Sequence, residues 1–180
     1  MNRAGKRMAE NAEILLQARK FRVERRVQVL PDGRAHEREV VVHPGAVTIL
    51  PILDDGRVCL IRNYRVAVGE TLIELPAGTL DTGENPAETA RRELIEETGF
   101  RAQNIEPLCE FFMSPGILSE RMFVFVATGL QAGESALEAG EQIEPLLVSW
   151  EDAIKLIASG DIRDAKSIAA LLFYERFRRK

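Results

Sequence analysis

Three glutamates lie within five residues of one another in a stretch that has the features of a helix. The stretch begins with Asn85 and a proline, which favour the cap and the first position of a helix, and it ends at a glycine, a common helix stop. A helix over 86–98 would place Glu93 and Glu97 one turn apart, with Glu96 beside them. Like charges at this spacing repel each other, so the carboxylates must either face water or be neutralised.

Two interpretations of these acids compete. One is a solvated acidic face with neighbouring arginines as local partners. The other is a cation site, because Mg²⁺ prefers oxygen ligands and is typically held by one or two carboxylates together with substrate phosphates. The segment before the helix favours the cation site: an apolar strand over 72–75 ends at Pro76, and Gly78 then allows a turn that brings the backbone close to an ion.

Fixed residues extend this pattern in both directions. Five residues separate Gly78 from the first acid, and seven more separate that acid from an Arg-Glu-Leu triplet, before the final acids, glycine and apolar residue. The whole reads G-x5-E-x7-R-E-U-x-E-E-x-G-U, where U is apolar. At a frequency of about 7 % for each fixed residue, chance would produce it about once in 10⁹ starting positions. The pattern resembles the Nudix box, carried here by Gly78, Glu84, Arg92, Glu93, Leu94, Glu96, Glu97, Gly99 and Phe100.

The resemblance to Nudix hydrolases covers about residues 22 to 177 and points to the ADP-ribose pyrophosphatase branch. Four segments outside or overlapping the box carry it: Arg62-Asn63-Tyr64-Arg65, Leu75-Pro76-Ala77-Gly78, Ser114-Pro115-Gly116 with Glu120 after it, and the run 160–167. It implies an α+β chain with the Nudix fold, an α/β/α sandwich around a mixed central sheet, plus a small N-terminal antiparallel sheet.

The resemblance also implies roles for individual residues. The carbonyl of Ala77 and the carboxylates of Glu93, Glu96, Glu97 and Glu141 would bind Mg²⁺ or Mn²⁺. Glu84 and Arg92 would hold these ligands in position. Substrate would contact Gly78, Arg65 and Glu120, and also Arg38 and Glu39, an Arg-Glu pair near the adenosine end that often comes from a partner subunit.

The catalytic base has two candidates. Related enzymes take it from a late acidic loop, two residues before the position that Glu141 fits, but Ala139 stands there in this chain. Glu138 or Glu141 would therefore accept the proton, alongside the catalytic contribution of Glu96. The implied reaction is hydrolysis of ADP-ribose to AMP and ribose 5-phosphate. The alternatives are another nucleoside diphosphate sugar such as GDP-mannose, or a Nudix regulator that binds nucleotides without chemistry.

The rest of the chain supplies a frame for this site. Residues 1–20 are expected to form a frayed or short helix, and a hairpin should follow, with strands at 21–30 and 37–43 and a Pro-Asp-Gly turn between them. Such a hairpin is only marginally stable alone. The extension 1–43 is therefore predicted to mediate homodimer formation, and residues 44–180 are predicted to form the catalytic domain. Further strands are expected at 46–53, 57–61, 71–75, 108–113, 122–127 and 146–150, and helices at 151–159 and from Asp164 onward.

Composition agrees with a globular enzyme. The chain has 180 residues, 46 % hydrophobic and 29 % charged, with a net charge of −4. This acidic balance argues against nucleic-acid binding, and only two histidines argue against a histidine-based triad or zinc site. Cys59 and Cys109 are isolated, as in a reducing compartment. No apolar run is long enough for a membrane span, so a cytoplasmic location is expected.

Overall fold

The structure, a computed structural model, describes residues 12–81, 83–137, 140 and 142–179. Ten strands and three helices follow one another in this part of the chain. They are β1 (Glu13–Gln17), β2 (Arg22–Val29), β3 (Ala35–Val42), β4 (Ala46–Pro51), β5 (Val58–Arg65), β6 (Glu70–Glu74), β7 (Ala77–Thr79), α1 (Pro86–Thr98), β8 (Arg101–Phe112), β9 (Arg121–Gln131), β10 (Ile143–Val148), α2 (Trp150–Ala158) and α3 (Ala165–Phe177).

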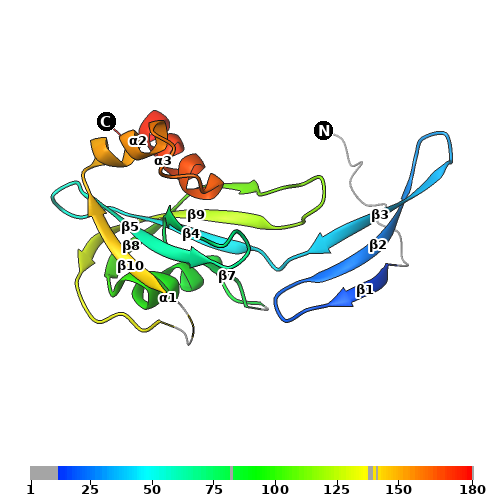
Figure 1. Cartoon of the computed structure of the whole chain (residues 1–180), viewed down its shortest axis with the longest axis horizontal. Coiled ribbons are helices and arrows are strands. Elements are labelled where there is room, and N and C mark those ends of the chain that lie inside the picture. The colour runs from blue at the N-terminus through cyan, green and yellow to red at the C-terminus, as the bar shows by residue number, and fades with distance from the viewer. Residues whose placement is uncertain (1–11, 82, 138–139, 141, 180) are drawn as a thin grey trace.

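The elements from β4 onward, which we call the body, contain two sheets between helices. One sheet has the order β7-β4-β9-β8 and is mixed, because β4 and β9 run parallel while the other pairs are antiparallel. The second has the order β10-β5-β6 and is antiparallel. Helix α1 lies on one side of these sheets, and α2 and α3 pack together on the other (Figure 1). The predicted α+β fold with a mixed sheet between helical layers is confirmed.

Strand β4 is the centre of the core. All six of its residues are buried. Val47 and Ile49 belong to the apolar cluster that includes Leu94 of α1, whereas Leu50 belongs to the cluster that includes residues of α2 and α3. A strand buried on both faces has little freedom to shift, because protein cores are densely packed. Strand β7 pairs with β4 at Thr48↔Ala77 and Val47↔Gly78. The segment that carries two residues of the predicted site, Ala77 and Gly78, is therefore fixed to the core.

The N-terminal sheet, formed by β1, β2 and β3, extends away from the body (Figure 1). The predicted β2–β3 hairpin is present, with Gly33 at φ 84° in its turn. The prediction of a helix before it is wrong for the described residues, because 13–17 form strand β1 along β2; residues 1–11 lie outside the described part of the chain. An isolated apolar triplet at 14–16 carries no helical periodicity, and pairing with a distant strand decides its conformation.

Several boundaries also differ from the prediction, among them the start of β8 and the start of α2. Strand β8 begins at Arg101, seven residues before the expected 108, because its polar first half pairs with β9 up to a bulge between Pro107 and Cys109. Trp150 was expected at the end of a strand but starts α2, since Ser149 caps that helix by accepting from the backbone of Asp152. No described helix has the length and apolar character needed to cross a bilayer.

Candidate active site

Helix α1 spans the predicted residues, and its caps are the predicted ones. The side chain of Asn85 accepts a hydrogen bond from the backbone N–H of Ala87, and Gly99 ends the helix in the left-handed conformation at φ 75°. Ala90 and Leu94 are buried against the core. The helix is therefore fixed in rotation, and this orientation directs Glu93 and Glu97 toward a cavity of about 630 Å³.

Glu97 is bound to the segment that precedes the helix. Its Oε2 accepts a hydrogen bond from the backbone N–H of Ala77 at 2.8 Å, and only 3 % of the residue is exposed. A buried carboxylate is costly unless hydrogen bonds or opposite charges compensate it. The contact places the carboxylate of Glu97 beside the backbone of Ala77, the residue whose carbonyl is also a predicted metal ligand.

Gly78 makes room for Glu93. A Cβ atom at position 78 would lie 1.9 Å from both Cδ and Oε1 of Glu93, far inside contact distance. The expected turn at Gly78 is wrong, because the residue lies in strand β7 opposite Val47 and is absent from the positive-φ glycines of the described chain. Glycine is required here because the Glu93 carboxylate closely approaches the backbone.

Arg92 joins the acids of the box. Its guanidinium lies 2.8 Å from Glu93, 2.9 Å from Glu96 and 3.3 Å from Glu84. Partial burial lowers the pKa of Arg92, but its hydrogen bond to Glu84 and the charges of Glu93 and Glu96 outweigh that effect and raise the pKa overall. One cation thus offsets the repulsion among three carboxylates and orients them.

Most of the site residues predicted from the sequence line this cavity, but some do not. It is lined by Ala77, Gly78, Arg92, Glu93 and Glu97, together with Arg65 and Glu120 from other parts of the chain. Glu84 and Glu96 do not line it, but both contact Arg92, and Glu84 also accepts from the backbone N–H of the lining residue Asp81. Glu138 and Glu141, the two candidate bases, lie outside the described residues.

Arg38 and Glu39 are also remote from the cavity of their own chain. They lie on β3, opposite Arg26 and Arg25 of β2. Arg38 donates to the carbonyl of Glu37, and Glu39 lies 3.5 Å from Arg25. Neither residue lines the cavity, so a substrate contact by this pair would have to be made in another subunit.

A buried ionic cluster on the cavity wall was missed from the sequence. Glu74, which is 1 % exposed, accepts from Nε and Nη2 of Arg65 at 2.9 and 2.6 Å, and from Nζ of Lys166 at 2.7 Å. Burial raises the pKa of Glu74, but the hydrogen bonds from Arg65 and the charge of Lys166 outweigh it and lower the pKa overall. The available signal was a lone acid in the apolar run 72–75, since a buried carboxylate needs a partner.

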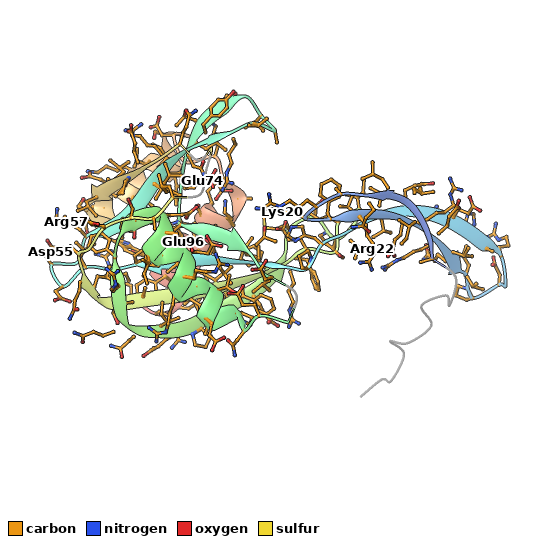
Figure 2. The ribbon with its side chains drawn as sticks, turned by 90° about the horizontal axis from the view of Figure 1, so that it is seen from below. Lys20, Arg22, Asp55, Arg57, Glu74 and Glu96 are labelled. Atoms are coloured by element: carbon orange, nitrogen blue, oxygen red, sulfur yellow. The ribbon has the colours of Figure 1, made fainter. Side chains whose placement is uncertain are left out.

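The turn between β1 and β2 was missed as well. Arg19, Lys20, Phe21 and Arg22 line the same cavity as the box glutamates. Figure 2 shows Lys20 at the end of the N-terminal sheet that adjoins the body. The buried Glu24 holds Arg22, and it also contacts Arg26 at 2.7 Å. The cavity is therefore lined both by carboxylates of α1 and by cationic groups from the N-terminal sheet and from β5.

The donor set fits a hard divalent cation. Glu93, Glu97 and the peptide of Ala77 offer only oxygen ligands, and two carboxylates match the usual number for Mg²⁺. Across residues 12–81, 83–137, 140 and 142–179, no group of three or more histidine, cysteine or acidic side chains forms a metal centre by itself. Glu93, Glu97 and the Ala77 carbonyl could hold such a cation, with substrate phosphates as further ligands.

Comparisons with known proteins agree with this geometry. The chain is 40 % identical over 148 residues to the ADP-ribose pyrophosphatase of Bacillus subtilis (strain 168), covering 81 % of this chain and 80 % of that protein. Two other relatives are each 35 % identical: the methanol dehydrogenase activator of Bacillus methanolicus, covering 81 % and 80 % of the two chains, and the GDP-mannose pyrophosphatase of Enterobacter sp. (strain 638), covering 78 % of each. A crystal structure of an ADP compounds hydrolase superposes with a TM-score of 0.81 at 29 % identity, covering 94 % of this chain and 92 % of that chain. The family model of the NUDIX domain matches residues 42–171, and the chain belongs to this family.

Proposed function

We propose that the protein hydrolyses the diphosphate bond of ADP-ribose, giving AMP and ribose 5-phosphate. The observation that supports this proposal is that acidic and basic side chains line the same cavity. Glu93 and Glu97 lie against the backbone of Ala77 and Gly78, and Arg65 also lines the cavity. A diphosphate needs both features, a cation site for its oxygens and a protein cation for its remaining charge. The names of the B. subtilis relative and of the superposed structure support ADP-ribose as the first choice of substrate.

The residues divide the chemical work among them. Glu93, Glu97 and the carbonyl of Ala77 would hold Mg²⁺ or Mn²⁺, and a bound divalent ion supplies charge neutralisation and a more acidic water. Arg65 binds phosphate oxygens and orients the diphosphate. Glu138 or Glu141 takes the proton from the attacking water, which adds to one phosphorus while the bridging oxygen leaves with the other phosphate.

We also propose that the protein is a homodimer through the N-terminal sheet, with 1–43 as the dimerising extension of a catalytic domain 44–180. Apolar side chains on this sheet are exposed in the single chain, among them Ile14 at 57 %, Leu16 at 50 % and Val29 at 65 %. Exposed apolar groups gathered on one small sheet favour burial against a partner. In the dimer, Arg38 and Glu39 of one chain would approach the adenosine end of the other chain's cavity.

Sedimentation of the purified protein tests the dimer. We expect a dimer for the full chain, and a monomer with weakened substrate binding after removal of residues 1–43. A truncated protein that stays dimeric would contradict assembly through this sheet, and a fully active monomer would contradict the shared site.

The two isolated free cysteines, Cys59 and Cys109, fit the proposal that the protein works in the reducing cytoplasm.

A substrate panel tests the activity. ADP-ribose, GDP-mannose, NADH and diadenosine compounds are incubated with Mg²⁺ or Mn²⁺, and nucleotide release is measured with and without a chelator. We expect AMP release from ADP-ribose to have the highest kcat/KM and to stop with the chelator. A preference for GDP-mannose would reassign the substrate, and tight binding without turnover would indicate a nucleotide-binding regulator.

A further inference from the structure

We infer that Glu74 is a positioning residue for substrate binding, which holds the guanidinium of Arg65 in the cavity wall and is itself locked by Lys166. This inference rests on the proposed function, since it assigns the group that orients the phosphate-binding arginine. Glu74 is nearly inaccessible to solvent, so it acts through Arg65 and not on the substrate directly.

The pairing of Arg65 is selective. In the register of β5 and β6, Arg65 stands directly opposite Glu70, whereas Glu74 stands opposite Ile61. Yet Glu70 pairs with Arg163 at the surface, and Arg65 extends along the sheet to make two parallel hydrogen bonds with Glu74. Paired N–H donors on one carboxylate fix the plane of a guanidinium as well as its position. The choice of the buried acid over the exposed one thus sets the direction of Arg65.

Donor capacity remains for a ligand after this pairing. A guanidinium has five N–H donors and Glu74 accepts two of them, from Nε and Nη2. Arg65 keeps 38 % of its side chain exposed and lines the cavity. The remaining donors can therefore meet phosphate oxygens, for which the planar fork of arginine is well suited.

Lys166 is the second cation that holds Glu74 in place, and it contacts the same oxygen, Oε2, as Nη2 of Arg65. Its side chain is 9 % exposed, and its Nζ lies 2.7 Å from Glu74 and 2.9 Å from Asp164. Asp164 caps α3 by accepting from the backbone N–H of Ser167, and Ser167 Oγ accepts from the backbone N–H of Leu75 at 2.7 Å. The first turn of α3 therefore fixes the end of β6 through both backbone and charge, and Glu74 is kept ionised for Arg65.

The first experiment compares Glu74→Gln with Glu70→Gln. Glu70 is a matched control because it is a glutamate of the same strand that also forms an ion pair, but with Arg163 at the surface, just before α3. We expect Glu74→Gln to raise the KM for ADP-ribose, and the Kd of its non-hydrolysable methylene analogue, by about tenfold, the worth of one charged hydrogen bond. The kcat should change by less than about threefold. Glu70→Gln should leave KM, Kd and kcat unchanged. An unchanged Kd in Glu74→Gln would overturn the inference.

A double-mutant cycle separates positioning from a structural role. If Glu74 acts through Arg65, then adding Glu74→Gln to Arg65→Ala should not weaken analogue binding further. An equal loss in both backgrounds would mean that Glu74 only supports the fold, and would overturn the inference. If Glu74→Gln does not fold, Glu74→Gln with Lys166→Met removes both charges of the buried pair, which is often tolerated. This double variant should show the Kd expected for Glu74→Gln, and a wild-type Kd would again overturn the inference.

The design also separates this inference from the proposed function. Analogue binding needs no turnover, so the cycle can be read in an inactive protein. Failure of wild-type protein to release AMP from ADP-ribose would sink the proposed activity. Additive losses in the cycle would sink only the positioning role of Glu74.

Discussion

The carboxylate of Glu97 accepts a hydrogen bond at 2.8 Å from the backbone N–H of Ala77, twenty residues earlier in the chain. The contact joins the last turn of α1 to strand β7. It also means that a change at Glu97 affects a metal ligand and a backbone contact together, and the two effects can be separated by choice of substitution.

Glu97→Gln should abolish most activity while the fold survives. The amide oxygen of glutamine can still accept from Ala77, but the ligand charge is lost. Because even the partners of metal ligands are worth about 10- to 100-fold in affinity or activity, we expect turnover to fall by about 100-fold or more. Glu88→Gln, on an exposed position of the same helix, is the control. Near-normal turnover of Glu97→Gln under saturating Mg²⁺ would contradict the metal role.

Gly78→Ala should displace Glu93. The added Cβ would lie 1.9 Å from the Glu93 carboxyl group, so that side chain must leave its position. We expect a large loss of kcat and weaker Mn²⁺ binding, measured by calorimetry. Ala77→Gly is the neighbouring control: it keeps the carbonyl and should lose only about 0.5–1 kcal/mol of stability from added backbone freedom. Equal activity of Gly78→Ala and wild type would show that Glu93 is not needed where it lies.

Arg92→Ala should destabilise the metal-free protein. It leaves the carboxylates of Glu84, Glu93 and Glu96 without the guanidinium that contacts all of them. Because the site is partly exposed, we expect a loss of about 1–2 kcal/mol in the free energy of unfolding. Added Mg²⁺ should restore part of it. Arg91→Ala removes a neighbouring exposed arginine that donates to the carbonyl of Ala102. If both variants lost the same stability, repulsion among the box acids would not be the cause.

Glu138→Gln and Glu141→Gln should be unequal. A general base contributes about 10²- to 10⁴-fold to a rate, so the variant that removes it should show the larger fall in kcat with little change in KM. The slow variant should also lose the acid limb of its pH–rate profile. If neither substitution slows the reaction, the base lies elsewhere in the chain.

The stability of the protein should depend on pH through Glu74. Folding lowers the pKa of this carboxyl below its ordinary value of 4.5. A group of this kind contributes stability that is fully present above the unfolded pKa and is lost as the pH falls through the folded pKa. Denaturant unfolding between pH 7 and the acid range should therefore show a fall below about pH 4.5, and the fall should be smaller in Glu74→Gln. Parallel curves for the two proteins would contradict the ionised, paired state of Glu74.

Local signals were enough to predict α1 and its acids. Asn85, Pro86 and Gly99 act within a turn of the helix they delimit, so the sequence shows both ends. Strand β1 could not be found this way, because only pairing with β2 makes 13–17 a strand. Glu74 was missed for the same reason: its partner Lys166 lies 92 residues away. The need for glycine at position 78 could not be predicted locally either. It arises because Glu93, from a helix that packs on β4, lies against this position.

The turn between β1 and β2 has an evolutionary consequence. It lines the cavity with Arg19, Lys20 and Phe21, yet it belongs to a sheet separate from the one that carries Ala77 and Gly78. Substitutions in this turn would change the lining of the cavity and leave the pairing of β7 with β4 unaltered.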